Sequence, residues 1–253
     1  MRLLADKIAL VTGASRGIGN AIALRLAQDG AVVAVHYRAA REQAERTLEL
    51  IQQNGGDGFL IAADLAEPSG AQQLADALIE AIKARRDPPI LDILVNNAGI
   101  DDRKTIEEVT ENDFDRMLQI NFKSPFFLIQ KLLPFFGSGG RIINISSMAT
   151  RLSLPNMPVY APTKAALSTL SRILASHLGP RGITINSILP GATSTDMNPA
   201  ASDPERSQAI RNTVALGRIG QPDDVAPIVA FLASNDGGWI TGETIEVSGG
   251  QRL

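Results

Sequence analysis

Residues 7–19 read K-I-A-L-V-T-G-A-S-R-G-I-G, and the rest of the chain is organised around this stretch. Its apolar, β-branched start is typical of a short buried strand, and after Gly17 apolar residues recur at helical spacing. Between the two elements, Gly13, Gly17 and Gly19 stand where a backbone needs positive φ or a close approach to a ligand. The amides of such a turn point from a helix N-terminus towards an anion, and a pyrophosphate fits that description. The spacing departs from the usual G-x-G-x-x-G fingerprint, so the same glycines are also compatible with a turn that binds nothing.

The alternation of strand and helix continues to the end of the chain. Further strands are predicted at 31–37, 58–63, 91–95, 141–145, 183–189 and 244–247. Helices are predicted directly after Gly17 and at 42–53, 71–84, 112–136, 159–178 and 223–233. Such alternation implies right-handed crossovers, so we expect a doubly wound, mostly parallel seven-stranded sheet with helices on both faces.

The bulk composition bounds the class of protein. With 253 residues and 44% hydrophobic side chains, one α/β domain over 1–253 is favoured over two small domains. A net charge of -3, from 24 basic and 27 acidic residues, gives no electrostatic footprint for nucleic acid or for an anionic membrane surface. The chain has no cysteine and only His36 and His177, which excludes disulfides and Cys-ligated metals and leaves too few histidines for a histidine-built metal site. The start, M-R-L-L-A-D-K, predicts neither a secretory signal nor a membrane span, so a cytoplasmic enzyme is the default.

Small and polar residues directly follow several of the predicted strands. These residues are Gly13, Asp64, Asn97, Ser147 and Gly191. In an open parallel sheet, ligands bind outside the carboxyl ends of the strands, so these positions are expected to converge on one edge. Each residue alone is compatible with an ordinary loop, but together they indicate a nucleotide-binding edge.

Tyr160 and Lys164 form the stretch Y-A-P-T-K inside a predicted helix. Four residues of helix rise about 6 Å and place the phenol and the ammonium on the same face. A neighbouring ammonium favours the phenolate and lowers a tyrosine pKa that starts near ~10, which would make Tyr160 a proton donor and acceptor near neutrality. The same spacing is common on surface helices, so by itself it does not establish catalysis.

At these residues the sequence resembles the short-chain dehydrogenase/reductase family over essentially its whole length. The family's T-G-x-x-x-G-x-G turn appears at 12–19, its N-N-A-G at 96–99 and its Y-x-x-x-K at 160–164, in family order. A P-G-x-x-x-T segment at 190–195 also matches, and the tail resembles bacterial 3-oxoacyl-carrier-protein reductases and related carbonyl reductases. Pro162 departs from the family pattern, but a proline in the first turn of a helix is tolerated because its missing N–H has no partner there.

The resemblance implies a single-domain Rossmann fold and a catalytic set of Asn121, Ser147, Tyr160 and Lys164. Tyr160 would give a proton to the carbonyl oxygen while a hydride passes between the nicotinamide and the carbonyl carbon. Lys164 would lower the tyrosine pKa and hold the nicotinamide ribose, Ser147 would bind the carbonyl oxygen, and Asn121 would hold a water that passes protons to Lys164. Ser147 is preferred to Ser146 because it lies 13 residues before Tyr160, as in relatives, although either hydroxyl is chemically capable.

The resemblance also implies where a dinucleotide would lie, with Asp64 reaching the adenine. The implied cofactor-binding positions are Gly13, Ser15, Arg16, Gly17, Ile18, Gly19, Tyr37, Arg38, Asp64, Leu65, Asn97, Ala98, Gly99, Tyr160, Lys164, Pro190, Gly191, Thr193 and Thr195.

The end of the second predicted strand indicates which dinucleotide binds. Relatives that use NAD carry an aspartate where this chain has Tyr37, because a carboxylate accepts from the ribose hydroxyls and repels a 2′-phosphate. Here Arg38 follows immediately and Arg16 stands in the glycine-rich turn. Two guanidiniums can bind a phosphate through charge-assisted hydrogen bonds of ~1.5 to 3 kcal/mol each, so we expect NADP(H). Both arginines are also compatible with a solvated surface.

Residues 192–215 are small, polar and punctuated by proline. A segment of that length between ordered elements is usually a substrate lid or disordered, and in the family it covers the substrate. Met148, Leu152, Leu154 and Met157 lie between Ser147 and Tyr160 in the sequence. They are expected to form a pocket wall, although they are equally compatible with packing core.

The family resemblance implies a homotetramer that associates through its two long helices. The apolar positions on the helix 159–178 fit core packing as well as an interface; they are Leu167, Leu170, Ile173, Leu174 and Leu178. The leading function is an NADP(H)-dependent reductase of a small-molecule ketone or 3-oxoacyl thioester. An NAD-linked dehydrogenase of a secondary alcohol or sugar, and a non-catalytic dinucleotide-binding sensor or scaffold, are the alternatives. A scaffold has no chemical need for the full catalytic set, and fold analogy does not name the substrate.

Overall fold

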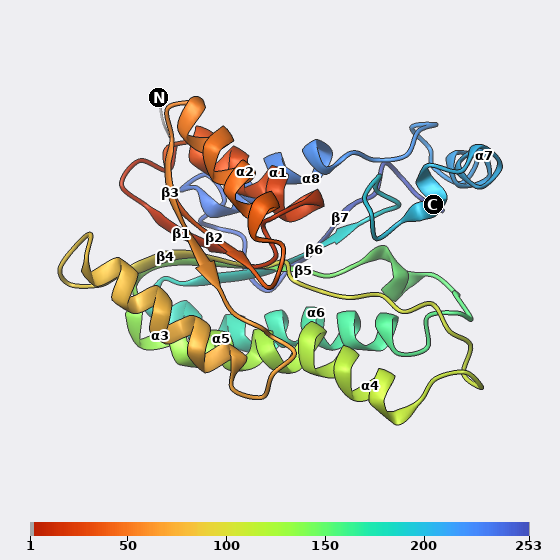
Figure 1. Ribbon diagram of the computed structural model, residues 1–253, viewed down its shortest axis with the longest axis horizontal. Helices are drawn as coiled ribbons and strands as arrows, with labels where there is room; N and C mark the ends of the chain where they lie inside the picture. Colours follow the sequence, from red (N-terminus) through yellow and green to blue (C-terminus); the bar gives the residue numbers. More distant parts are fainter. Residues whose placement is uncertain (1–2, 253) are drawn as a thin grey trace.

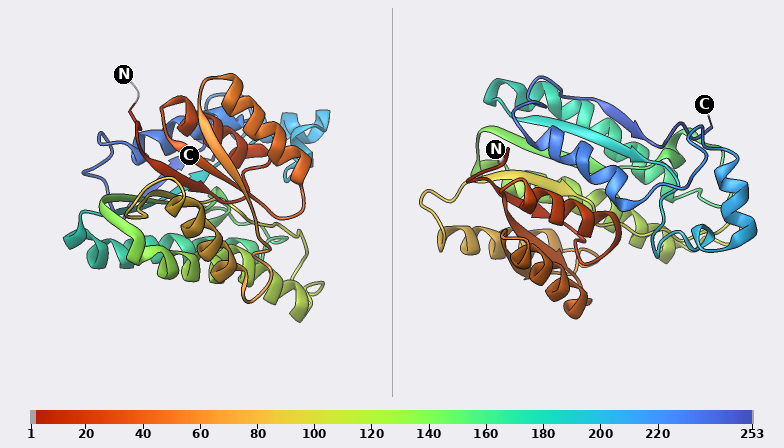
Figure 2. Two further views of the ribbon diagram at one scale, coloured as in Figure 1. Left: turned by 60° about the vertical axis from the view of Figure 1, so that its left-hand side comes forward. Right: turned by 90° about the horizontal axis from the view of Figure 1, so that it is seen from above.

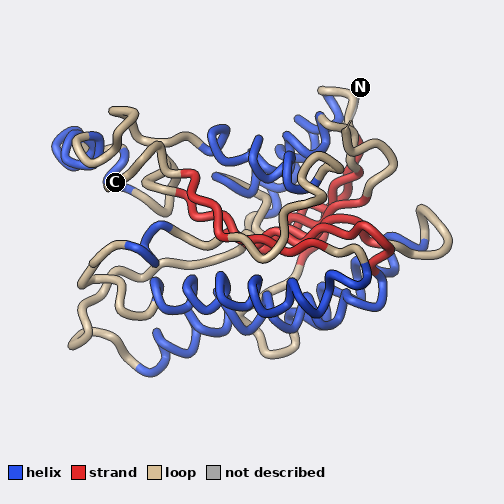
Figure 3. The backbone as a smooth tube through the Cα atoms, turned by 180° about the vertical axis from the view of Figure 1, so that it is seen from behind, coloured by secondary structure: helices blue, strands red, loops and turns tan. Residues whose placement is uncertain are grey.

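A seven-stranded, all-parallel sheet forms the centre of the protein, whose computed structural model describes residues 3–252 (Figures 1 and 3). The strands are β1 (Ile8–Val11), β2 (Val32–Tyr37), β3 (Asp57–Ala62), β4 (Leu91–Asn96), β5 (Phe136–Ile145), β6 (Thr184–Pro190) and β7 (Thr244–Val247). Their order across the sheet is β3-β2-β1-β4-β5-β6-β7. The strand order reverses between β1 and β4, and in open α/β sheets a crevice for ligands opens at such a switch point. The predicted Rossmann architecture is therefore confirmed.

Helices cover both faces of the sheet (Figure 1). One face carries α1 (Gly17–Gln28), α2 (Arg41–Gln53) and α8 (Pro222–Ala233); the other carries α3 (Gly70–Lys83), α4 (Glu111–Leu118), α5 (Ser124–Leu132) and α6 (Tyr160–Leu178). Side chains alternate along each strand, so Ala9 and Val11 of β1 join one hydrophobic core while Ile8 and Leu10 join the other. Strands buried on both faces read as continuous apolar runs, which is why the sequence located them.

The predicted helix 112–136 is wrong in one respect, because it is two helices rather than one. Between α4 and α5, residues Gln119–Lys123 form a π-helical turn, and Leu133–Phe135 close the segment as a 3-10 turn. Pro125 explains the position of the π turn: it has no N–H to give to the carbonyl of Asn121, and its ring crowds that carbonyl. The wider turn relieves the crowding, and such turns often mark functional sites.

The segment 192–215, expected to be a lid or disordered, contains regular structure, and its role as a lid stays a prediction. It contains a 3-10 turn at Pro199–Ala201 and the helix α7 (Pro204–Arg211), whose first turn is capped by the Asp203 carboxylate. The Ser194 N–H donates to the Gly220 carbonyl (2.8 Å), and Val214 pairs with Gln251 in an isolated antiparallel bridge. Figure 2 shows α7, in light blue, standing beyond the ends of the C-terminal strands.

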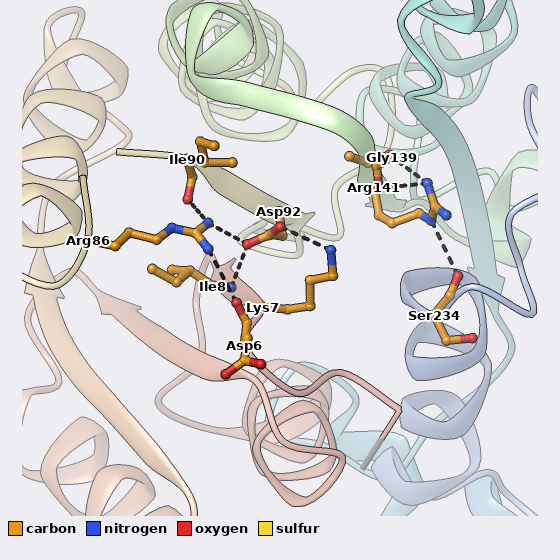
Figure 4. Close-up of polar contacts among 10 residues, drawn as sticks. Asp6, Lys7, Ile8, Arg86, Ile90, Asp92, Gly139, Arg141 and Ser234 are labelled. Carbon is orange, nitrogen blue, oxygen red and sulfur yellow. Dashed lines mark hydrogen bonds and ion pairs between the residues drawn. The ribbon is translucent and has the colours of Figure 1, made fainter. Parts of the chain in front are cut away.

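The amino ends of the strands are fastened by charged side chains (Figure 4). Asp92, just inside β4, accepts from Lys7 Nζ (3.3 Å), Arg86 Nη2 (2.6 Å) and the backbone N–H of Ile8 (2.9 Å). Also towards the amino end of the sheet, Arg141 of β5 donates to the carbonyls of Gly139 (2.8 Å), Gly140 and Ser234 (3.3 Å). The first group of contacts joins β1 to β4, and the second joins β5 to the end of α8. Within residues 3–252, no helix combines the length and apolar character that a membrane crossing requires.

Candidate active site

A cavity of about 990 Å³ lies at the carboxyl ends of the strands. It is lined by the loops that follow β1, β2, β3, β4, β5 and β6, by the first turn of α6 and by parts of the segment 192–215. Every catalytic and cofactor-binding residue predicted from the sequence lines this cavity except Asn121. The sheet therefore brings together the residues that the sequence placed after separate strands.

The glycine-rich turn is shaped by its own packing as well as by the space it leaves for a ligand. Gly13 has a φ of 64°, which favours glycine, and a Cβ at Gly19 would lie 2.3 Å from the Gly13 carbonyl oxygen and 2.4 Å from Asn97 Nδ2. Asn97 Nδ2 donates to the carbonyls of Thr12 (2.8 Å) and Gly13 (3.1 Å). The N-N-A-G segment thus fixes the turn from the neighbouring strand.

His36 holds the same turn from the other side. Its Nδ1 accepts from the Gly13 N–H (3.0 Å), so its Nε2 carries the proton and donates to the Ala63 carbonyl (3.1 Å). Burial lowers the pKa of His36 to about 4, which keeps the ring neutral. Among the described residues, no group of three or more histidine, aspartate or glutamate side chains is arranged to bind a metal ion.

The end of β2 carries the residues expected to choose the dinucleotide. Tyr37 is buried there, and Arg38 is exposed and forms no ion pair within residues 3–252. Arg16 pairs with Asp196 of the segment 192–215 at 3.1 Å, with both side chains more than half exposed. An exposed pair of this kind is weak, so the guanidinium remains available to another anion.

Tyr160 and Lys164 begin α6 and lie on one helix face, as the spacing predicted. Lys164 Nζ lies 5.9 Å from the centroid of the Tyr160 ring and donates to the Ile145 carbonyl at the end of β5 (2.8 Å). Ser147, two residues beyond that carbonyl, hydrogen-bonds the tyrosine through its hydroxyl. A phenol, an ammonium and a hydroxyl therefore meet at one end of the cavity.

The pKa of Tyr160 moves in the direction opposite to the one expected from the sequence. Burial raises this pKa to about 12; the Ser147 hydrogen bond lowers it, the charge of Asp101 raises it and the charge of Arg103 lowers it. Burial also lowers the pKa of Lys164 to about 8. The net shift of the Tyr160 pKa is upward because removing the phenolate from water outweighs the nearby charges, and a lowering by Lys164 stays a prediction. Tyr160 is consequently a protonated donor at neutral pH.

Asn121 is placed in the wall behind the cavity rather than in it. Its side chain is fully buried in the π turn, where Oδ1 accepts from the Ile100 N–H (2.9 Å) and Nδ2 donates to the Ile100 carbonyl (3.0 Å) and to Thr163 Oγ1 (3.2 Å). A Cβ at Gly99 would lie 3.2 Å from both Asn121 Oδ1 and Lys164 Nζ. Asn121 thus holds the loop after β4 close to the ammonium.

The two serines after β5 have different surroundings. Ser146 Oγ donates to the Lys164 backbone carbonyl (2.8 Å) and accepts from Ser168 Oγ (2.9 Å), so it fastens α6 to the sheet. Ser147 Oγ accepts from the Ala149 N–H (3.1 Å) and remains beside the tyrosine. The geometry therefore favours Ser147 for contact with a carbonyl oxygen.

The cavity wall near these serines is largely apolar. Met148, Leu152, Leu154 and Met157 all line it, and Met148 and Met157 are buried as well. Both readings of these residues, as pocket wall and as packing core, describe part of what they do.

Sequence reasoning missed several residues that line the cavity. They include His36, Asp101, Arg103, Asn156, Asp196 and Gln251. For Asp101 and Arg103 a signal was present, because both follow N-N-A-G at the end of a strand that already pointed to the site. Asn156 and Asp196 lie in two stretches that were already expected to face the substrate, whereas His36 and Gln251 reach the cavity through tertiary packing that has no local pattern.

Comparison with known proteins agrees with this geometry. A family model described as Enoyl-(Acyl carrier protein) reductase matches residues 13–252. The 3-oxoacyl-acyl-carrier-protein reductase FabG of Staphylococcus aureus is 40% identical over 249 residues, covering 98% of each chain. Versicolorin reductase of Emericella nidulans is 39% identical, covering 98% of this chain and 96% of its own. Among solved structures, the angucycline C-6 ketoreductase LanV with bound NADP is 43% identical with a TM-score of 0.95, covering 99% of this chain and 97% of its own.

Proposed function

This chain belongs to the short-chain dehydrogenase/reductase family, and from that premise we propose that it is an NADP(H)-dependent oxidoreductase. It reduces the carbonyl of a ketone or 3-oxoacyl compound, or oxidises the matching secondary alcohol. The observation that carries the proposal is the meeting of Tyr160, Ser147 and Lys164 at one end of a cavity whose other end holds the glycine-rich turn and two arginines.

The donor chemistry of the cavity fits such a cofactor. The turn amides at the N-terminus of α1 suit a pyrophosphate, and Lys164 suits a ribose hydroxyl. No carboxylate ends β2, while Arg16 and Arg38 line the cavity and suit a 2′-phosphate. When bound, the cofactor supplies or takes the hydride of the reaction.

The protein's own part in the reduction is to place the carbonyl and to deliver a proton. The Tyr160 hydroxyl donates its proton to the carbonyl oxygen, and the Ser147 hydroxyl, which is beside it, hydrogen-bonds the same oxygen. Lys164 has donors left after its bond to Ile145, and its positive charge stabilises the phenolate that forms. Asn121 is proposed to hold a proton-relaying water for Lys164; the closeness of both side chains to Gly99 supports this role.

The segment 192–215 is proposed to act as the lid of the substrate end. Met197, Ile210 and Thr213 of this segment line the cavity, as do the apolar residues Met148, Leu152, Leu154 and Met157. The segment is held near its two ends, by the hydrogen bond from Ser194 to Gly220 and by the bridge between Val214 and Gln251. A segment held at its ends suits closure over a bound substrate.

The protein is also proposed to be a cytoplasmic homotetramer. The helices α5 and α6 keep apolar side chains exposed, namely Phe126, Phe127 and Ile173. The other apolar positions of α6 pack largely into the core: Leu167, Leu170 and Leu178 are buried. Light scattering at micromolar concentration tests the assembly, and a monomer would contradict it.

Activity is tested by following NADPH absorbance with a panel of ketones that includes an acetoacetyl thioester. We expect turnover with at least one ketone and a higher kcat/KM for NADPH than for NADH. Binding of NADPH without turnover of any ketone or alcohol would instead indicate the non-catalytic sensor. A preference for NAD with secondary alcohols would indicate the NAD-linked dehydrogenase.

A further inference from the structure

Asp101 and Arg103 form an ion pair on the loop that leaves β4 beside the catalytic tyrosine. Arg103 Nε lies 3.1 Å from Asp101 Oδ2, and both residues line the cavity. The pair follows Gly99 on the same loop, and a Cβ at Gly99 would lie 3.2 Å from Lys164 Nζ, so the loop passes beside the ammonium just before the pair. The bonds of Asn121 to both backbone groups of Ile100 fix the loop just before the pair.

The two members of the pair are unequal in their exposure. The Asp101 side chain is only 5% exposed, whereas that of Arg103 is 41% exposed. The second carboxylate oxygen, Asp101 Oδ1, is buried and has no hydrogen-bond partner among the described residues. A buried carboxylate with one unpaired oxygen is unfavourable by itself, and burial raises its pKa. Its one side-chain partner is Arg103, so its evident role is to hold that guanidinium in place.

The Arg103 guanidinium is left with unused donors. Only Nε is engaged; Nη1 and Nη2 form no hydrogen bond or ion pair with residues 3–252. A guanidinium fixed at one edge presents its remaining donors in a planar fork, which matches the two oxygens of a carboxylate. Among the described residues, the other cationic side chains that line the cavity are Arg16, Arg38, Lys164 and Arg252.

We propose that Arg103, positioned by Asp101, recognises an oxyanion carried by the substrate at a distance from its carbonyl, as in an oxo acid. This inference rests on the proposed reductase function and names the substrate class for it. Two sources supply such a group: the carboxylate of a free oxo acid, and the phosphate of a carrier-linked acyl thioester.

The test compares matched ketones with and without the anionic group. 4-Acetylbenzoate is compared with its methyl ester, and acetoacetyl coenzyme A with acetoacetyl N-acetylcysteamine, which lacks the phosphates. We expect the anionic member of at least one pair to have a kcat/KM about 10-fold higher, as a charge-assisted bond at a partly exposed site allows. The pair that responds identifies the source of the oxyanion.

Variants assign the preference to the ion pair. Arg103→Met should bring the ratio of kcat/KM between anionic and neutral ketones close to one, and Arg103→Lys should restore part of it, because a lysine keeps the charge without the fork. Asp101→Asn should reduce the ratio less than Asp101→Ala, since an amide oxygen still accepts from Nε. Lys104→Met is the matched control: this neighbouring cation pairs with Asp102 and Asp113, lies outside the cavity and should leave the ratio unchanged.

The outcomes separate this inference from the proposed function. Reduction of neutral ketones with no preference in either pair, or a preference that survives in Arg103→Met, would overturn the role of Arg103 alone. An equal loss of preference in Lys104→Met would show general charge attraction and overturn it as well. Absence of any ketone reduction would overturn both proposals.

Discussion

Asp92 at the amino end of the parallel sheet and the charged groups of the cavity at its carboxyl end differ in how completely they are paired. At the amino end, Asp92 has two cationic partners and a backbone N–H, as Figure 4 shows. At the carboxyl end, Lys164 is buried with a carbonyl oxygen and no carboxylate partner among the described residues, and Asp101 keeps one oxygen unpaired. Burial raises the pKa of Tyr160 to about 12 and lowers that of Lys164 to about 8.

The difference teaches which end serves stability and which serves chemistry. A paired, hydrogen-bonded charge stabilises the fold and has nothing left to offer a ligand. A buried charge without a counter-ion is unfavourable for the fold, but it is ready to interact with a bound molecule. Changes at the carboxyl end should therefore affect rate and specificity, and changes at the amino end should affect the free energy of unfolding.

The largest expected effect is that of Tyr160→Phe, which keeps the ring and removes the proton donor. We expect kcat to fall by roughly 10²-fold or more, because general acid catalysis contributes about that much. Binding of NADPH, measured by fluorescence, and the melting temperature should change little. A variant that keeps more than about half the parent activity would show that Tyr160 is not the acid.

The second effect concerns the cofactor end of the cavity. Tyr37→Asp combined with Arg38→Ala introduces a carboxylate for ribose hydroxyls and removes a phosphate ligand. The ratio of kcat/KM between NADPH and NADH should shift by about 10²-fold towards NADH. Arg41→Ala is the control, because Arg41 is exposed, pairs with Glu45 and lies outside the cavity. Equal use of both cofactors by the parent protein would contradict the argument.

The pH dependence should separate activity from stability at one residue. Because the pKa of Lys164 is lowered to about 8, the ammonium is lost above that pH, and kcat/KM should fall by roughly 10-fold per pH unit. The unfolded lysine, with its pKa of 10.5, stays protonated longer, so the unfolded state binds more protons between pH 8 and 10.5. The free energy of unfolding should therefore gain at most about 3 kcal/mol from this residue as pH rises through that window.

Lys164→Met isolates this contribution to the pH dependence. Denaturant unfolding of the parent protein and of the variant is compared from pH 7 to pH 10, and the difference between the two curves should change with pH as described. A difference that stays constant would mean that the pKa of Lys164 is not lowered in the folded protein.

The smallest effect on rate is expected at the amino end. Asp92→Asn keeps the shape of the side chain but leaves Lys7 and Arg86 without their anion. The free energy of unfolding should fall by about 1 to 3 kcal/mol, while kcat/KM stays within about twofold of the parent value. Asp76→Asn, an exposed position on α3, should change neither quantity. A large loss of rate in Asp92→Asn would contradict the claim that the amino end serves stability and the carboxyl end serves chemistry.

Most of the fold was predictable because its signals are local. Apolar runs located each strand, and the positions after the strands located one edge of the sheet. The broken helix was missed because Pro125 and Pro134 each stand where a continuous apolar pattern still reads as one helix. The early start of β5 at Phe136 was missed because its first half contains three glycines, which carry no pattern.

The sequence by itself determined where the strands lie along the chain and where the glycine-rich turn stands. It also determined the spacing that places Tyr160 and Lys164 on one helix face. These depend on residues a few positions apart, so backbone periodicity is enough. Only the tertiary structure decided that Tyr160 is held protonated, that Asn121 lies behind the cavity wall, and that Asp101 holds Arg103 at the reacting end. The physical reason is that burial and charge act through space: the groups that set them come from strands and loops distant in the sequence, and no local pattern records their distance.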